Sequence, residues 1–184
     1  KGILARVVIL CPYGDKLKFE LNHRYTIIEG PEEDVLSRYG LAMEIYKPDY
    51  LVRLTGDCAW LPARVISKCI RDTVKYDADY CSNVLVRSFQ EGYDCEVLSA
   101  RAFHFCHENA KDSKGREHVT SFLRTEIEHQ RLKDFKVHTV MNDYDLSEVK
   151  TSIDTPEEYE TAVSLWESFQ RKKSQAACFG SISV

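Results

Sequence analysis

Residues 49–58 read DYLVRLTGDC, a short apolar run that ends in Gly56-Asp57. The run predicts a buried strand, because it is brief, rich in β-branched and aromatic residues, and bounded by a proline and a glycine. In α/β proteins ligands bind outside the carboxyl ends of the strands, which is where Asp57 would lie. There its carboxylate could hold a hard cation such as Mg²⁺ against phosphate oxygens. Asp154 follows a second predicted strand, residues 149–153, in the same way.

Both aspartates also have a purely structural interpretation. Asp57 could be a solvated turn residue that follows the strand. Asp154 could cap the helix that begins at Thr155-Pro156. Thr155 and Glu158 have the spacing of a capping box, and Pro156 suits the first helical position. The residue patterns alone leave these alternatives open.

The composition is that of a globular chain. Of 184 residues, 43% are apolar and 29% are charged, which suits one domain with a real core rather than a disordered chain. Lys and Arg number 25 against 29 Asp and Glu, and the net charge of -4 argues against non-specific nucleic-acid binding. No apolar run approaches the roughly 20 residues of a membrane span. The first residues also lack the pattern of a signal peptide.

The seven cysteines are scattered singly, and no CxxC pair suggests a zinc ribbon or a thioredoxin-type site. We expect reduced, buried thiols in a cytoplasmic protein. A nucleophilic Cys58 is the functional alternative, but no histidine stands near it in the sequence to act as its base.

Predicted strands and helices alternate along the chain. Strands are expected at residues 5–11, 24–29, 50–54, 80–83, 94–98, 135–141 and 149–153. Helices are expected at residues 14–23, 31–46, 62–76, 99–108 and 116–129, and from residue 156 on. This order predicts an α/β fold with three layers, a mostly parallel sheet and a small antiparallel insertion within residues 84–100. We expect a single domain over residues 1–170 and a tail over residues 171–184.

Two of these helices carry an expected core-facing stripe. In the helix that opens at Pro31, where Glu32, Glu33 and Asp34 suit the positive end, the stripe is Val35, Tyr39, Ala42, Met43 and Tyr46. In the last helix, the residues expected to face the core are Tyr159, Ala162, Val163 and Trp166.

Five stretches, taken in order, carry a resemblance to a known family. They are residues 32–39 (EEDVLSRY), 52–58 (VRLTGDC), 79–83 (DYCSN), 116–120 (REHVT) and 153–160 (IDTPEEYE). Together they resemble the cytidylyltransferases that activate acidic sugars. The closest type is the spore-coat polysaccharide cytidylyltransferase, related to the synthetases of CMP-sialic acid and CMP-ketodeoxyoctonate. The resemblance runs from about residue 5 to residue 170.

This resemblance implies a nucleotidyltransferase fold of the GT-A-like, Rossmann-like type. It also implies a reaction in which a sugar hydroxyl attacks the α-phosphate of CTP and pyrophosphate leaves. By position, Asp57 and Asp154 match the family's aspartates that hold Mg²⁺, which polarises the phosphate and lowers the pKa of the nucleophile.

The sequence departs from the family pattern at three places. The strand and loop that normally open the family, and that hold the base and the triphosphate, have no counterpart before residue 5. Ala59-Trp60 follows Cys58, where the family usually has proline, and Glu91-Gly92 stands in place of Asp-Gly.

Three further residues are candidates near the ends of strands. Arg53 could contact the nucleotide, or it could alternate outward and pair with a surface carboxylate. Asn83 could hydrogen-bond the sugar, or it could serve as a turn residue. Asp94 could bind a sugar hydroxyl or a metal, or it could simply start a strand.

The cluster Arg116-Glu117-His118 opens a predicted helix. The resemblance suggests that this cluster faces the sugar, where Arg116 could bind a carboxylate in bidentate fashion and His118 could act as an acid or base. The alternative is an ordinary first helical turn, with Glu117 complementing the helix dipole.

The expected function is therefore Mg²⁺-dependent transfer of CMP from CTP to an acidic sugar. The alternative is a catalytically inactive member or fragment that binds a ligand or a partner, and a related enzyme that uses UTP or another alcohol is a third possibility. We expect no nucleic acid or membrane among its partners, and we expect a homodimer. The expected dimer surface is the apolar segment of residues 84–100, which contains Phe89, Tyr93, Cys95, Val97 and Leu98.

Overall fold

The computed structural model describes residues 6–15 and 25–179, with side chains through residue 172. The helix expected at residues 14–23 falls largely on residues 16–24, which lie outside the described part. Among the described residues, no helix is both long and apolar enough to cross a bilayer.

The strands form two sheets. In the first, β1 (Val8–Pro12) and β2 (Thr26–Gly30) run parallel. The second has the order β3-β5-β4-β6, and β5 runs antiparallel to both of its neighbours, whereas β4 and β6 are parallel. Its strands are β3 (Tyr50–Arg53), β4 (Tyr80–Ser82), β5 (Glu96–Ser99) and β6 (Val137–Thr139). The expected α/β class is confirmed, and the antiparallel part is a single strand inserted between β3 and β4.

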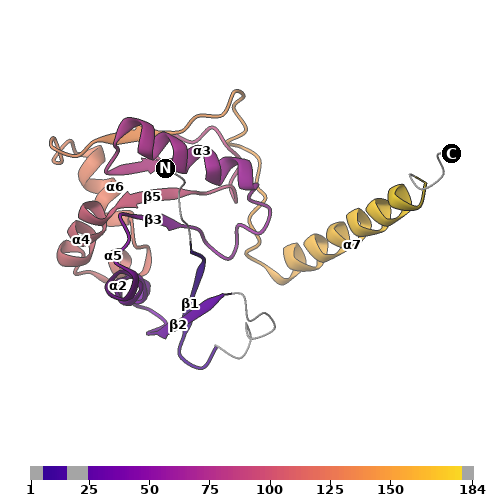
Figure 1. The fold of residues 1–184 in the computed structure, drawn as a ribbon, viewed down its shortest axis with the longest axis horizontal. Helices are drawn as coiled ribbons and strands as arrows, with labels where there is room; N and C mark the ends of the chain where they lie inside the picture. Colours follow the sequence, from indigo (N-terminus) through magenta and orange to yellow (C-terminus); the bar gives the residue numbers. More distant parts are fainter. Residues whose placement is uncertain (1–5, 16–24, 180–184) are drawn as a thin grey trace.

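Helices cover both faces of the second sheet (Figure 1). They are α2 (Val35–Tyr46), α3 (Ala63–Tyr76), α4 (Ala100–Asn109), α5 (Ser113–Glu117) and α6 (Ser121–Glu128). Helix α7 (Pro156–Phe179) lies outside these layers (Figure 1). Neighbouring residues of a strand point to opposite faces. Tyr80 and Leu98 therefore pack with α2, α4 and α6, whereas Cys81 and Val97 pack with α3. The expected three layers follow from this alternation.

Helix α2 begins later than its sequence pattern suggests. Its N-cap is Asp34, whose side chain accepts a hydrogen bond from the Ser37 N–H at 3.0 Å. Pro31 therefore precedes the helix instead of opening it. Of the expected stripe, Ala42 and Met43 are buried, and Val35 and Tyr39 are partly buried against the core. Leu36, which the stripe leaves out, is fully buried.

The segment expected to form a dimer surface lies in the core. Phe89 is 7% exposed, and Cys95, Val97 and Leu98 are at most 1% exposed. The expectation is wrong because β5 is an interior strand, which is covered on both faces and paired on both edges.

Two other expected elements differ in the structure. Residues 149–153 form no strand, and their β-pairing within the described residues is one isolated bridge between Lys150 and Glu91. The helix expected at residues 116–129 is divided into α5 and α6. The break is at Val119, whose φ of +36° a β-branched residue rarely adopts.

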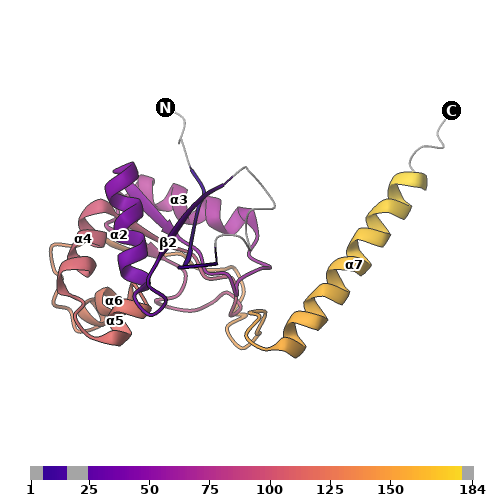
Figure 2. The same ribbon diagram turned by 90° about the horizontal axis from the view of Figure 1, so that it is seen from below.

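Helix α7 starts with the expected capping box. The Glu158 N–H donates to Thr155 Oγ1 at 3.2 Å, and the Thr155 N–H donates to Glu158 Oε2 at 3.0 Å. The helix then continues through the expected tail to Phe179 and projects from the body (Figure 1, Figure 2). Of its expected core-facing residues, Ala162 is buried, but Tyr159, Val163 and Trp166 are exposed. That part of the prediction is wrong, because the body does not cover this face.

Candidate functional site

The loop after β3 carries Asp57 and lies against the segment that carries Asp154. The Ile153 N–H donates a hydrogen bond to the Asp57 carbonyl oxygen at 2.9 Å. The residue directly before Asp154 is thus bonded to the Asp57 backbone. The fold brings together these two loops, which are far apart in the sequence.

The two carboxylates have different surroundings. Within the described ranges, the Asp57 carboxylate makes no hydrogen bond or ion pair with protein. Asp154 Oδ2 accepts hydrogen bonds from Lys150 Nζ and Ser152 Oγ, each at 2.8 Å. The hydrogen bond from Lys150, followed by that from Ser152, lowers the pKa of Asp154 below its usual value. Because Thr155 caps α7, the capping interpretation of Asp154 does not hold. A metal ion shared by Asp57 and Asp154 stays a prediction.

Asp94 is held by an arginine that the sequence analysis missed. Arg87 Nη1 and Nη2 contact the two Asp94 carboxylate oxygens at 2.7 and 3.0 Å, a bidentate pair. Asp94 and Asp57 both act on the Cys58 thiol: burial is the main cause that raises the Cys58 pKa, and these two negative charges add to it. A thiol kept protonated is a poor nucleophile, so this setting disfavours the nucleophilic interpretation of Cys58.

A third loop, residues 90–94, approaches the segment that carries Asp154 at Gly92. The Gly92 φ is +95°, and a Cβ at this position would lie 2.4 Å from the Ser152 backbone nitrogen. The Glu91 N–H donates to the Val149 carbonyl at 2.9 Å, and the Thr151 N–H donates back to the Glu91 carbonyl at 2.8 Å. The loops of residues 55–58, 90–94 and 149–154 therefore converge. We call their carboxylates, Asp57, Glu91, Asp94 and Asp154, the acidic site.

Arg53 lies inside the sheet rather than at the acidic site. Its Nη1 is 2.6 Å from Oε2 of Glu96, its cross-strand neighbour on β5, and Glu96 is only 2% exposed. Glu96 also accepts hydrogen bonds from Tyr80 and, at 3.1 Å, from Thr120 Oγ1. This placement favours pairing with a carboxylate, although that carboxylate is buried and not on the surface. A contact from Arg53 to a nucleotide stays a prediction.

Both polar atoms of the Asn83 side-chain amide form hydrogen bonds with the backbone. Its Oδ1 accepts from the Cys95 N–H at 2.9 Å, and its Nδ2 donates to the Tyr93 carbonyl at 2.6 Å. With 1% exposure, this side chain shapes the entry into β5. The placement favours the structural alternative, and a contact to sugar stays a prediction.

Arg116 lies at the amino end of α2. Its Nη2 contacts Asp34 Oδ2 at 2.6 Å and Ser37 Oγ at 2.7 Å. Partial burial acts to raise the Asp34 pKa, but hydrogen bonds from Arg116 and Ser37 outweigh it, so the pKa lies below its usual value. Glu117 and His118 are exposed beside Arg116. No hydrogen bond or ion pair within the described residues joins these three side chains to the acidic site.

Sequence signals existed for two of the missed residues. Glu96 is an acid inside an apolar strand, and a buried charge needs a partner. Lys150 stands four residues before Asp154 and eight before Glu158, and it contacts both at 2.8 and 2.6 Å. Arg87 gave no such signal, because only the folding of the loop over residues 84–94 brings it to Asp94.

The acidic site suits a cation that is shared with substrate. The described residues hold no group of three or more His, Cys, Asp or Glu side chains arranged for a metal ion. Mg²⁺ needs only one or two protein carboxylates when phosphate oxygens supply the rest. Asp57, whose carboxylate oxygens no described residue engages, fits that requirement after β3, and Asp154 is the candidate for a second ligand.

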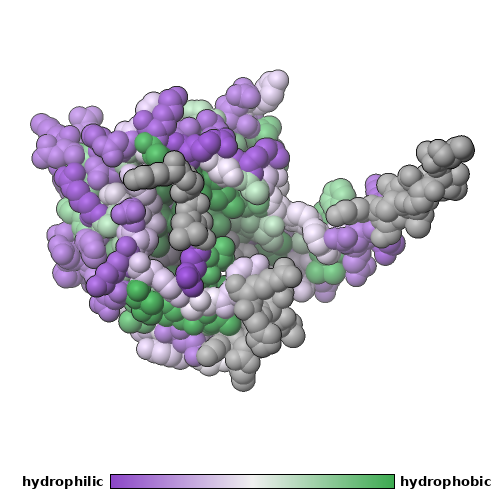
Figure 3. Space-filling view, viewed as in Figure 1, coloured by the Kyte–Doolittle hydropathy of each residue, from purple (hydrophilic) through white to green (hydrophobic). Residues whose placement is uncertain are grey.

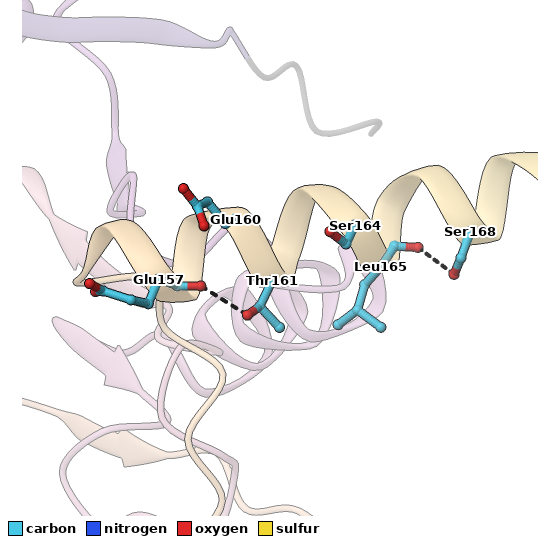
Figure 4. Close-up of a pocket in the computed structure, with 6 residues that line it drawn as sticks. All are labelled: Glu157, Glu160, Thr161, Ser164, Leu165 and Ser168. Atoms are coloured by element: carbon cyan, nitrogen blue, oxygen red, sulfur yellow. Dashed lines mark hydrogen bonds between the residues drawn. The ribbon is translucent and has the colours of Figure 1, made fainter.

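Two hollows of the surface lie elsewhere. A hollow of about 550 Å³ runs along α7, where Thr161, Ser164 and Ser168 line one helix face (Figure 4). Another, of about 880 Å³, lies between α2 and α4 near Asp49, at the amino end of β3. We place the site by its chemistry, because neither hollow contains Asp57.

Two curated proteins are similar in sequence to parts of this chain. No family model matches the chain. An uncharacterized protein, MJ1063 of Methanocaldococcus jannaschii, is 33% identical over 99 residues, which cover 53% of this chain and 39% of that protein. The spore coat polysaccharide biosynthesis protein SpsF of Bacillus subtilis is 25% identical over 144 residues, 78% of this chain and 58% of SpsF. The chain thus spans 39% to 58% of the length of these relatives.

A solved structure shares the fold. It is a cytidylyltransferase from Leptospira borgpetersenii serovar Hardjo-bovis, with a TM-score of 0.76 and 24% sequence identity, matched over 91% of this chain and 76% of that one. The similarity to SpsF and this common fold together confirm the resemblance that the five sequence stretches indicate, namely to the cytidylyltransferase family of the spore-coat type.

Proposed function

We propose that the protein is a sugar nucleotidyltransferase, which transfers CMP from CTP to an acidic sugar with release of pyrophosphate and depends on Mg²⁺. The observation that carries this proposal is the Asp57 carboxylate, which has no partner among the described residues and stands where the loop of Asp154 meets it. The shared fold and the similarity to SpsF, a polysaccharide biosynthesis protein by name, support the reaction class.

In this proposal each loop of the acidic site has its own task. Asp57 and Asp154 would hold Mg²⁺, which supplies charge neutralisation at the phosphates. Asp94, fixed by Arg87, would accept a hydrogen bond from a sugar hydroxyl. The hydroxyl oxygen forms a bond to the α-phosphorus as the bond to the pyrophosphate oxygen breaks, and the hydroxyl proton leaves to a base.

Other candidates would act at the edge of the site. Arg116 would bind the sugar carboxylate, with Glu117 and His118 beside it, once Asp34 releases the guanidinium. Arg53 would act through its pair with Glu96, and Asn83 would act through the backbone of Tyr93 and Cys95 that it holds. Selection of cytosine over another base is part of the proposal.

A second candidate is an inactive member that binds a ligand or a partner. Internal pairing favours it, since Lys150 engages Asp154, Arg87 engages Asp94 and Asp34 engages Arg116. CTP titrated into the chain with Mg²⁺ separates the two candidates: the enzyme binds it, whereas a protein without a nucleotide site does not.

Pyrophosphate release from CTP and a sugar acid in the presence of Mg²⁺ tests the enzyme directly. We expect Asp57→Asn to lower kcat/KM by roughly 10²- to 10³-fold, in the range of other groups that stabilise transition-state charge. Asp143→Asn is the matched control, because Asp143 is exposed and lies outside the acidic site. Equal turnover of the two variants would refute the role of Asp57.

A further inference from the structure

One buried carboxylate lies between the two groups of candidate residues. Figure 3 shows that much of the outer rim of the body is hydrophilic, which is where charged side chains usually lie. Glu96, at the start of β5, is instead only 2% exposed. Its Oε2 accepts from Arg53 Nη1 at 2.6 Å and from Thr120 Oγ1 at 3.1 Å, and its Oε1 accepts from the Tyr80 hydroxyl. These donors come from β3, from the start of α6 and from β4.

The contact with β3 leads to the acidic site. Arg53 is the last residue of β3, four residues before Asp57, and it pairs with Glu96 across the sheet. Glu96 itself follows Asp94 by two residues, and Arg87 holds Asp94 by a bidentate contact. The end of β3 and the beginning of β5 therefore approach the acidic site from neighbouring strands, and the Glu96 carboxylate holds them together.

The contact with Thr120 leads to the cluster Arg116-Glu117-His118. Thr120 follows this cluster by two residues and is fully buried. Arg116 in turn reaches the start of α2, where its Nη2 contacts Asp34 and Ser37 at 2.6 and 2.7 Å. Within the described part of the chain, no direct hydrogen bond joins the cluster to the acidic site. The Glu96 carboxylate therefore connects the two groups.

The turn that carries Thr120 departs from local backbone preferences in two ways. Val119 has a φ of +36°, which is strained for a β-branched residue. Thr120 is the N-cap of α6, yet its side chain makes no capping hydrogen bond, and its hydroxyl donates to Glu96 instead. Backbone strain persists where surrounding contacts determine it, and it is concentrated at functional sites. Both departures place the Thr120 hydroxyl against Glu96.

Stability of the core does not require this third contact. Arg53 already supplies a positive charge to Glu96, and Tyr80 supplies a second donor. A buried ion pair is often no more stabilising than apolar residues of similar volume. Without the Glu96 contact, the Thr120 oxygen could cap α6, as threonine usually does. The contact is better explained by the position that it gives to the cluster before it.

An enzyme with two substrates depends on the spacing of the groups that hold them. In the proposed reaction the sugar hydroxyl has to come within roughly 3–3.5 Å of the α-phosphorus, and a small misplacement lowers the rate strongly. Asp57 would hold the nucleotide through Mg²⁺ and Arg116 would hold the sugar carboxylate, so their separation has to be fixed. We propose that Glu96 and Thr120 are positioning residues that fix the place of Arg116 relative to the acidic site. This inference rests on the proposed function.

Substitutions at Thr120 test the role of its hydroxyl. Thr120→Val keeps the shape of the side chain and removes the donor, whereas Thr120→Ser keeps the donor. Thr73→Val is the matched control, because Thr73 in α3 is also buried, with 1% exposure, and donates to the Cys69 carbonyl at 2.8 Å. Thr120→Ala also removes the donor, and it replaces the valine variant if circular dichroism shows that the valine variant does not fold.

The Asp34 carboxyl reports the position of Arg116 without any substrate. Partial burial acts to raise its pKa, but hydrogen bonds from Arg116 and Ser37 hold that pKa below the ordinary value. In a ¹³C NMR titration, Thr120→Val should raise the Asp34 pKa toward its ordinary value, because the guanidinium is displaced. The Asp34 pKa should stay low in Thr120→Ser and in Thr73→Val. An unchanged Asp34 pKa in Thr120→Val would overturn the inference, whatever the activity of the protein.

Pyrophosphate release measures the same displacement in the reaction, with sialic acid or ketodeoxyoctonate as the sugar acid. We expect Thr120→Val to lower kcat/KM for the sugar acid by roughly 10- to 10²-fold and to leave the KM for CTP unchanged. Thr120→Ser should restore the wild-type value, and Thr73→Val should match it. Equal losses in Thr120→Val and Thr73→Val, or a rise in the KM of both substrates, would indicate a purely structural role and overturn the inference. No release by the wild type would instead remove the proposed function on which the inference rests.

Discussion

At the scale of single residues, the Arg53–Glu96 pair shows how strongly one buried charge constrains its surroundings. Glu96 is 2% exposed and receives hydrogen bonds from Arg53, Tyr80 and Thr120, which come from β3, β4 and the start of α6. Burial, followed by the charge of Glu96, raises the pKa of Tyr80 well above its usual value, so Tyr80 stays a donor. The group ties three elements to one carboxylate.

We expect Glu96→Ala to lower the free energy of unfolding by about 3–5 kcal/mol, because it leaves the Arg53 charge buried without a partner. The double variant Arg53→Met/Glu96→Gln should lose less, since no charge remains and the introduced glutamine amide can still accept a hydrogen bond. Urea denaturation followed by circular dichroism measures both. A loss in Glu96→Ala no larger than in the double variant would contradict this account.

At the scale of elements, most strands and helices follow from periodicity, and the misses share a physical cause. The sequence predicts β3, β4, α3 and α4 to within two residues at each end. The prediction from sequence fails where tertiary contacts determine the backbone conformation. Val119 adopts a positive φ between two helices, and residues 149–153 form a single β-bridge instead of a strand. Asp57 and Asp154 could be named from their places after apolar runs, whereas Arg87 could not.

The loop of residues 90–94 depends on Gly92 for its shape. We expect Gly92→Ala to destabilise the fold by about 1–3 kcal/mol, because alanine disfavours a positive φ and its Cβ would overlap the backbone of residues 151–152. Gly56→Ala, in the loop of Asp57, is the control, since it meets open space. Thermal unfolding of both variants measures the difference, and similar melting temperatures would show that the close approach is not needed.

At the scale of the whole molecule, the fold class and the layers were predictable, but the surface of α7 was not. An amphipathic pattern predicts that one face of a helix is buried, but it does not predict whether the same chain or another molecule buries it. The pattern therefore predicts burial of Tyr159 and Trp166, which the structure leaves exposed. The dimer surface expected at residues 84–100 fails for a related reason, because its apolar residues belong to an interior strand.

The charged side chains also give the molecule a response to acid. The Asp34 pKa is lowered in the folded protein, so its pair with Arg116 contributes fully above the unfolded value of 3.8 and is lost as the pH falls through the lower folded value. We expect unfolding free energy to fall between about pH 5 and pH 2. Arg116→Ala should reduce that loss of unfolding free energy by up to about 1 kcal/mol. Arg131→Ala, which removes an exposed pair with Glu126, serves as the control.

The position of β5 bears on how the chain is made. Because β5 lies between β3 and β4, those two strands cannot bond to each other. During synthesis, β3 and β4 leave the ribosome before β5. The backbone groups that pair with β5 therefore lack hydrogen-bond partners until β5 has also left the exit tunnel. Domains complete their folding as units during synthesis. We therefore expect a nascent chain that ends before residue 96 to need a chaperone. A chain that extends beyond residue 99 can form the pairing of β3, β5 and β4.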